Sequence, residues 1–203
     1  MRLGIMGGTF DPIHFGHLVA AQEVLWALGL EKMLFVPAGE PPHKISDGSS
    51  SVSHRVQMVK LAIACNPGFE LSMVDASRPG KSYTVDTLRI LREQLGSGVE
   101  LFFVLGMDSL AELINWKDPA GIIAQCRLAV VNRPPYPELE LTALERELPG
   151  IADRLDVVFM PGIGTSASEL RRRVAAGQPI RYQLPEAVEA YIGNHGLYQS
   201  VKA

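Results

Sequence analysis

The sequence predicts an α/β fold: a doubly wound, Rossmann-like parallel sheet of about six strands with helices on both faces. Apolar runs of strand length recur along the chain, at residues 3–6, 33–36, 69–73, 101–105, 128–131 and 157–160. Between most of them apolar residues fall at helical spacing, which predicts helices over residues 18–28, 52–64, 84–94, 120–124, 143–147, 168–176 and 185–194. Because strands alternate with helices, we expect the strands to be parallel.

The turn that follows the first predicted strand is the most informative segment. Residues 7–17 read GGTFDPIHFGH and lead directly into the first predicted helix. Gly7 and Gly8 let the backbone come close to an anion, and the free N–H groups at the start of a helix point at such a ligand. His14 and His17 lie three residues apart where the helix begins, so both rings can face one ligand. A single histidine there would more often be structural, but the combination predicts a phosphate site.

Proline-rich stretches separate several of the later elements. Residues 38–51 are rich in Pro, Gly and Ser, and we expect this long loop to be a mobile flap. Pro134, Pro135 and Pro137 predict a second loop after the strand at 128–131. The last helix has Pro185 in its first turn and stops before Gly196, which suits a helix C-cap.

Length and composition limit the class of protein. The 203 residues are 47% hydrophobic and 20% charged, which is typical of a globular chain with a sizeable core. The formal net charge of −3 argues against a broad surface for DNA or RNA. No apolar stretch approaches the roughly 20 residues that span a bilayer, and no signal-peptide pattern is present, so we expect a cytoplasmic protein. Cys65 and Cys126 lack metal-ligand spacing, which predicts no disulfide and no protein-bound metal.

Loops with polar, glycine or basic residues follow the carboxyl ends of five predicted strands, where open doubly wound sheets bind ligands. They are residues 7–17, 37–44, 106–108, 132–134 and 162–171. A polyanionic ligand would need a local cluster of donors, and the candidates are His14, His17, Lys44, Arg133 and Arg171. Arg55 begins a helix among polar neighbours, and we interpret it as structural.

A second motif occupies residues 165–171, which read TSASELR. Ser166 followed by Glu169 is a capping box, so a helix is expected to begin here. Its first turn offers N–H groups, the hydroxyls of Ser166 and Ser168, and the Arg171 guanidinium to a phosphate chain. Alone, the pattern fits a well-capped structural helix. Successive helical residues point about 100° apart, so at most one or two of Arg171, Arg172 and Arg173 face a common site.

The first turn is neither a GxGxxG fingerprint nor a Walker A loop. Its pattern Gly-x-Phe-Asp-Pro-x-His-x-Gly-His resembles the phosphate-binding signature of the nucleotidylyltransferase superfamily. Residues 165–171 resemble that superfamily's Ile-Ser-Ser-Thr-x-x-Arg signature, with Thr165 and Ala167 in place of Ile and Ser. Further stretches resemble bacterial nicotinate-nucleotide adenylyltransferases over nearly the whole chain, namely residues 41–44, 81–88, 106–110, 115–117, 132–134 and 191–198.

The resemblance implies a single nucleotidylyltransferase domain over residues 1–203, with about 162–203 a helical subregion that closes the ATP site. It implies adenylyl transfer from ATP, accompanied by Mg²⁺, to nicotinate mononucleotide, with catalytic roles for His14, His17, Lys44 and Arg171. The implied ATP-binding residues are Gly7, Gly8, Thr9, Phe10, His14, His17, Gly106, Asp108, Ser166, Ser168 and Arg171. The implied acceptor-binding residues are Tyr83, Thr84, Trp116 and Arg133.

Several of these residues have a second interpretation. Trp116 is implied to stack on the nicotinate ring, but it could instead anchor the core. Asp108 suits a ribose hydroxyl or a metal-bound water, or else it caps the next helix. Arg133 either reaches substrate phosphate or braces the proline-rich loop. Family members carry a Tyr between the equivalents of Asp108 and Trp116, where this chain reads LAELI, so one pyridine-ring contact is missing or replaced.

Two rival functions stay open at this point. One is another small-molecule nucleotidylyltransferase, acting on nicotinamide mononucleotide or phosphopantetheine, although the phosphopantetheine family has Thr in place of His14. The other is a non-catalytic nucleotide-binding module. We expect small-molecule partners, ATP and nicotinate mononucleotide, with no nucleic acid and no membrane, and the sequence leaves a homo-oligomer open.

Overall fold

The computed structural model describes residues 1–41, 49–133 and 141–199. Its strands are β1 (Arg2–Gly8), β2 (Lys32–Pro37), β3 (Phe69–Leu71), β4 (Glu100–Gly106), β5 (Arg127–Asn132) and β6 (Leu155–Phe159). Its α-helices are α1 (Phe15–Ala27), α2 (Val52–Ile63), α3 (Thr84–Leu95), α4 (Met107–Ala111), α5 (Pro119–Gln125), α6 (Leu141–Glu147), α7 (Ala167–Ala175) and α8 (Glu186–Asn194). Short 3₁₀ helices are η1 (Leu113–Asn115) and η2 (Ala152–Arg154).

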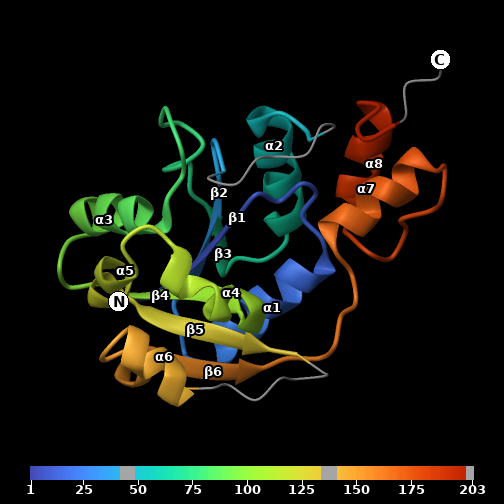
Figure 1. The fold of residues 1–203 in the computed structure, drawn as a ribbon. Coiled ribbons are helices and arrows are strands. Elements are labelled where there is room, and N and C mark those ends of the chain that lie inside the picture. Colours follow the sequence, from blue (N-terminus) through green and yellow to red (C-terminus); the bar gives the residue numbers. More distant parts are fainter. Residues whose placement is uncertain (42–48, 134–140, 200–203) are drawn as a thin grey trace.

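The strands of the described residues form one parallel sheet of six, in the order β3-β2-β1-β4-β5-β6 (Figure 1). β1 is central, pairing Leu3 with Lys32 of β2 on one side and with Leu101 of β4 on the other. The strand order reverses there, so the carboxyl ends of β1 and β4 form the crevice in which such sheets bind ligands. The predicted doubly wound sheet is therefore confirmed.

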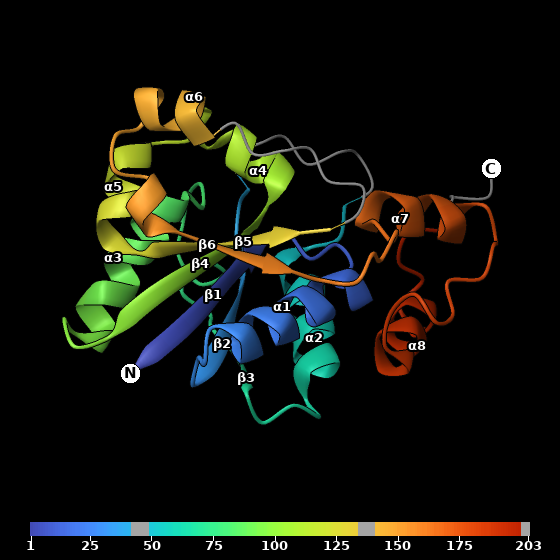
Figure 2. The same cartoon turned by 90° about the horizontal axis from the view of Figure 1, so that it is seen from below.

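Helices cover both faces of the sheet. In Figure 2, α4, α5 and α6 lie above it, and α1 and α2 lie below it; α3 packs in the same core as α5. Side chains of β1 alternate between two cores: Ile5 packs in the core that contains Leu88 of α3, and Met6 packs in the core that contains Val24 of α1. Because both faces of the four inner strands, β2, β1, β4 and β5, are buried, these strands are continuous apolar runs rather than alternating ones.

The last two helices do not cover either face of the sheet. α7 and α8 sit beyond the carboxyl ends of β5 and β6 rather than against a face of the sheet (Figures 1 and 2). Leu170 of α7 and Ile192 of α8 still reach the core beside α1. The backbone N–H of Phe15 donates to the carbonyl of Gln183 at 3.1 Å, which ties the start of α1 to the loop between these helices. The C-terminal helices therefore stand over the ligand-binding edge.

Several element boundaries differ from the predictions. α1 begins at Phe15, three residues earlier than predicted, because His14 caps it. β3 ends at Leu71, short of the predicted Met73. Pro185 is the N-cap of α8 rather than a residue of its first turn. The short helices α4, η1 and η2 were not predicted, because three to five residues are too few to show a helical period.

No helix among the described residues is both long and apolar enough to cross a bilayer. Cys65 is exposed and Cys126 is buried, and both are free thiols. Much of the predicted flap, including Lys44, and the prolines at 134, 135 and 137 lie outside the described residues.

Candidate active site

The turn after β1 folds back over the end of the strand. Phe10 adopts a left-handed φ of 52° and is buried, so its ring packs beneath the turn. There it meets the His17 ring edge-on, with the ring centroids 5.2 Å apart. The Asp11–Pro12 peptide bond is cis. The apolar Phe10 side chain thus supports one of the two predicted histidines from below.

His14 and His17 lie together at the start of α1, as the three-residue spacing predicted. Their ring centroids are 3.9 Å apart, with the planes inclined by 34°. The backbone N–H of His14, the N-cap residue, donates to Nδ1 of His17 at 3.3 Å. In a neutral imidazole the accepting nitrogen carries no proton, so the proton of His17 is on Nε2. His17 can therefore donate one hydrogen bond to a ligand.

Gly16 lets the His14 ring lie where it does. A Cβ at this glycine would come within 2.9 Å of both Cε1 and Nδ1 of His14, too close for an ordinary contact. His14 itself is only 7% exposed, and its Nδ1 has no hydrogen-bond partner among the described residues. The Gly-His pair at the end of the motif is thus explained by close packing as well as by the ligand.

Burial keeps both imidazoles neutral. It lowers the pKa of His14 to about 4, with the positive charge of Arg133 adding to the effect. Burial likewise lowers the pKa of His17 to about 3, with a further contribution from His14. At neutral pH the pair can therefore offer N–H donors to a ligand but carries no positive charge.

The second motif begins α7, as predicted. Ser166 is the N-cap, and its hydroxyl accepts a hydrogen bond from the backbone N–H of Glu169 at 3.3 Å. The Glu169 carboxylate does not complete the expected capping box, because it pairs with Arg172 at 2.6 Å. Arg173 donates to the carbonyl of Pro179. Of the three successive arginines, Arg171 alone lines the cavity described next.

A cavity of about 890 Å³ opens at the carboxyl edge of the sheet, over the end of β1. His17 and Arg171 line it together, and Nη1 of Arg171 donates to the carbonyl of Asp11 at 2.7 Å. Ser168, whose hydroxyl is 3.5 Å from Nη2 of Arg171, lies on the same wall. The predicted residues of the first turn that also line it are Gly7, Gly8, Thr9 and Phe10. The two motifs, more than 140 positions apart in sequence, thus meet at one space.

A second cavity of about 920 Å³ adjoins the first, and both are lined by Gly7, His17 and Trp116. The predicted residues found only on its wall are His14, Gly106, Arg133 and Ser166. Both imidazoles and the Arg171 guanidinium therefore open onto one joined space.

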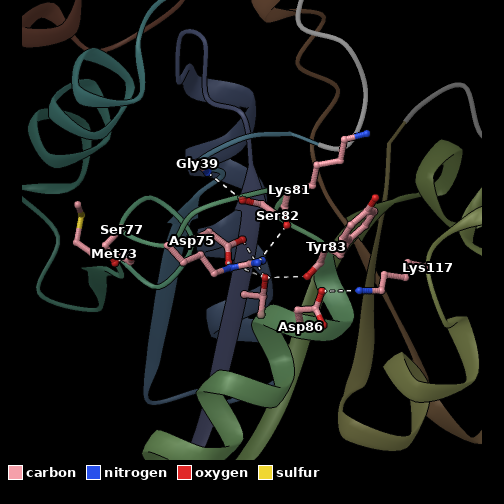
Figure 3. A network of polar contacts seen from close by, with 11 residues as sticks. Gly39, Met73, Asp75, Ser77, Lys81, Ser82, Tyr83, Asp86 and Lys117 are labelled. Carbon is pink, nitrogen blue, oxygen red and sulfur yellow. Dashed lines mark hydrogen bonds and ion pairs between the residues drawn. The ribbon is translucent and has the colours of Figure 1, made fainter.

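The other end of the first cavity is aromatic. Tyr83 is the N-cap of α3, and it lines the wall with Thr84 and Trp116. Trp116 is half-buried and meets Phe103 edge-on, with the ring centroids 6.1 Å apart, so part of its ring faces the cavity. Lys117 lies over the Tyr83 ring, 4.6 Å from the centroid, and pairs with Asp86 at 2.8 Å (Figure 3). A flat ring with an attached anion suits this wall.

Asp108 and Arg133 face each other across the ends of β4 and β5, with Nη2 and Oδ2 3.8 Å apart. The Asp108 side chain is 90% exposed. The alternative that Asp108 caps the next helix is wrong, because the N-cap of α4 is Gly106. Between Asp108 and Trp116, where the family resemblance predicted a Tyr, Leu110 and Leu113 are buried and Glu112 lines the cavity.

Sequence reasoning missed the polar contacts that hold the turn in place. Asp11 is 2% exposed, and its carboxylate accepts hydrogen bonds from the Ser50 backbone N–H at 3.2 Å and from the Tyr198 hydroxyl at 2.5 Å. Burial and the bond to Asp11 raise the pKa of Tyr198. Tyr198 lies 187 positions from Asp11 in the sequence, so no local pattern could have paired the two residues.

Comparison with known proteins agrees with these motifs. The pattern of the cytidylyltransferase-like family matches residues 5–173. A probable nicotinate-nucleotide adenylyltransferase of Thermomicrobium roseum is 48% identical over 202 residues, covering 100% of this chain and 94% of its own. One from a Roseiflexus species is 47% identical over 198 residues, covering 97% and 98% of the two chains.

Among solved structures, the nicotinic acid mononucleotide adenylyltransferase of Plasmodium falciparum, complexed with NaAD, is similar in fold. Its TM-score is 0.79 at 18% identity, and the match covers 97% of each chain. The same enzyme complexed with APC gives a TM-score of 0.76, also at 18% identity, covering 97% of this chain and 96% of that one.

Proposed function

Because the chain belongs to the nicotinate-nucleotide adenylyltransferases, within the cytidylyltransferase-like family, we propose that it transfers the adenylyl group of ATP to nicotinate mononucleotide. The products are nicotinate adenine dinucleotide and pyrophosphate, which makes the reaction a step of NAD biosynthesis. One observation supports this function above all: a single cavity joins the donors His17 and Arg171 to the aromatic wall of Tyr83 and Trp116.

The reaction needs little covalent help from the protein. The attacking group is a phosphate oxygen of nicotinate mononucleotide, which is already an anion at neutral pH, so no general base is required. It bonds to the α-phosphorus of ATP while the bond to the β-phosphate oxygen breaks and pyrophosphate leaves. The barrier lies in bringing two anions together and spreading charge over the transition state. Positioning and electrostatic stabilisation are therefore the work of the site.

The proposed ATP end uses both motifs. Nε2–H of His17 and the imidazole N–H of His14 donate to the phosphates, and the guanidinium of Arg171 supplies positive charge. Ser168 and the free N–H groups at the start of α7 hold the β- and γ-phosphates. The backbone of residues 7–10 lies along the same wall. Lys44 is proposed as a further catalytic cation.

The proposed acceptor end is the aromatic wall. Trp116 stacks on the nicotinate ring, and the backbone near Thr84 receives its carboxylate, with Tyr83 beside it. Arg133 is proposed to contact substrate phosphate from the second cavity. Its ion pair with Asp108 is exposed, so a phosphate can replace the carboxylate at low cost.

Mg²⁺ is proposed to accompany ATP. Within the described parts of the chain, no three His, Cys, Asp or Glu side chains cluster as metal ligands, which fits an ion carried on the ATP phosphates. The exposed carboxylate of Asp108 lines both cavities and can accept hydrogen bonds from the ion's water. When bound, the ion neutralises charge that develops on the leaving pyrophosphate.

We further propose that the C-terminal part, from about residue 162, is the helical subregion that closes the ATP site within one domain. Arg171 bonds to the carbonyl of Asp11, and Tyr198 bonds to the Asp11 carboxylate, so this part of the chain holds the turn from two sides. The reaction consumes ATP and a phosphorylated metabolite, so we place it in the cytoplasm.

Pyrophosphate release tests the function directly. ATP and Mg²⁺ are supplied with nicotinate mononucleotide, nicotinamide mononucleotide or phosphopantetheine in separate reactions. We expect release to be fastest by far with nicotinate mononucleotide. Faster release with another acceptor would identify a different nucleotidylyltransferase, and ATP binding without turnover on any acceptor would indicate a non-catalytic module.

A further inference from the structure

Arg55 is almost completely buried, which is uncommon for an arginine. It lies in the first turn of α2 and is 1% exposed, yet it lines neither cavity. Its guanidinium bridges two loops: Nη1 donates to the carbonyl of Thr9 at 2.8 Å, and Nη2 donates to the carbonyl of Gly39 at 2.9 Å. Burying a cation costs free energy unless its bonds compensate, so the two carbonyls are held firmly. One of them belongs to the phosphate turn and the other to the loop after β2.

Gly39 in turn contacts the loop that precedes α3. Its backbone N–H donates to the hydroxyl of Ser82 at 3.0 Å, as Figure 3 shows. A Cβ at position 39 would lie 2.4 Å from the carbonyl oxygen of Asp75, so only glycine lets the two backbones come this close. The loop after β2 is therefore clamped directly onto the loop that precedes α3.

The same loop holds the acceptor wall. The backbone N–H of Ser82 donates to the carbonyl of Glu40 at 2.7 Å. The Thr87 hydroxyl lies 3.1 Å from the carbonyl of Tyr83 and 2.8 Å from the buried carboxylate of Asp75. Arg78 also donates to Asp75, at 2.9 Å. Tyr83 is thereby fixed at the N-cap of α3, beside Trp116.

We propose that Arg55 is a positioning residue that sets the gap between the ATP-side turn at Thr9 and the acceptor-side wall at Tyr83. The path runs from Thr9 through Arg55, Gly39 and Ser82 to Tyr83 by direct hydrogen bonds and one peptide link. The inference rests on the proposed function, because the gap matters only if two substrates react across it. A misplacement of about 1 Å between reacting groups costs on the order of 10²-fold in rate. Arg55 thus acts on the rate without touching either substrate.

Arg55→Lys is the sharpest perturbation. It keeps the buried positive charge near Asp11, but a single ammonium cannot span two carbonyls as the flat fork of a guanidinium does. We expect the single-turnover rate, measured with enzyme in excess, to fall about 30- to 100-fold. The dissociation constants of a non-reactive ATP analogue and of nicotinate mononucleotide, each measured alone, should stay within about threefold of the wild-type values, because each half-site is intact.

Arg92→Lys is the matched control. Arg92 also donates to backbone carbonyls, those of Val99 and of Gln125, the latter at 3.0 Å, and it lines neither cavity. Arg92→Lys removes the same kind of forked contact with two carbonyls, but at a place outside the site. The single-turnover rate of this variant should therefore equal that of the wild type. All rates are measured well below each variant's melting temperature, which separates a positioning effect from a loss of stability.

The proposal is overturned if Arg55→Lys reacts at more than about a third of the wild-type rate, or if it loses rate only in proportion to lost affinity for one substrate. If Arg55→Lys does not fold, Ser82→Ala replaces it, because it removes the partner of the Gly39 N–H at the other end of the path. Ser82→Ala should slow single turnover about 3- to 10-fold with both affinities kept, and a wild-type rate would overturn the proposal. If the wild type itself releases no pyrophosphate, it is the proposed function that fails.

Discussion

The two nitrogens of the His17 ring have different roles, and two substitutions can test each role separately. Nδ1 accepts the backbone N–H of His14, and Nε2–H is the proposed phosphate donor. In His17→Asn an amide oxygen can take the place of Nδ1, but nothing reaches the place of Nε2. In His17→Gln an amide N–H₂ reaches the place of Nε2, but the acceptor for His14 is lost.

The expected effects are opposite in kind. Loss of a donor aimed at a transition-state charge costs roughly 3–4 kcal/mol, so His17→Asn should lower kcat by about 10²- to 10³-fold. Its stability should stay near the wild-type value because the start of α1 keeps its acceptor. His17→Gln should keep kcat within about tenfold of the wild type but lose about 1–2 kcal/mol of unfolding free energy, because a partly buried N–H is left without a partner. His17→Ala should show both losses.

The measurements are steady-state pyrophosphate release and urea denaturation of the same preparations. If His17→Asn turns over at nearly the wild-type rate, the phosphate-donor role of Nε2 is refuted. If His17→Gln is as stable as the wild type and His17→Asn is not, the assignment of the two ring nitrogens is reversed.

Three further results are expected. First, the unfolding free energy should fall as the pH drops from 6.5 to 4, because the unfolded chain protonates His14 and the folded chain does not; a pKa of about 4 corresponds to roughly 3 kcal/mol from His14 alone. A flat profile in urea melts over this range would contradict its burial as a neutral ring. Second, Tyr198→Phe removes the hydroxyl that donates to the buried Asp11 carboxylate and should cost about 1.5–3 kcal/mol of unfolding free energy; an unchanged melt would show that the contact carries no stability. Third, Trp116→Ala should raise the KM for nicotinate mononucleotide about tenfold with little change in the KM for ATP, whereas Trp116→Phe should recover part of the loss; equal effects on both substrates would place Trp116 elsewhere.

Much of the architecture could be predicted from local pattern. The inner strands are buried on both faces, so they appear in the sequence as short apolar runs, and the helices between the strands make parallel pairing the expected outcome. Helix α4 escaped prediction, because five residues cannot reveal a period. Because its N-cap is Gly106, Asp108 lies inside the first turn of α4 instead of capping it, and its exposed side chain lines both cavities.

The candidate site divides in the same way. The turn at residues 7–17 and the cap at Ser166 are local motifs, so the sequence could predict them. It also predicted that His17 and Arg171 belong to one site, and in the structure both line one cavity. Arg55 was interpreted as structural, and its buried contacts with two backbone carbonyls are indeed those of a brace. The two loops that Arg55 joins could not be predicted, because every residue has a backbone carbonyl and the sequence does not show which carbonyls a side chain contacts.

β1, the first strand along the sequence, lies in the middle of the sheet. On one side it must wait for β4: the side chains of Arg2 and Glu100, which pair at 3.1 Å, lie 98 positions apart. A nascent chain therefore carries an apolar strand with an open edge until β4 has also left the ribosome. Such distant pairing slows folding, so the arrangement that places the ligand crevice at the centre of the sheet also exposes the growing chain to aggregation.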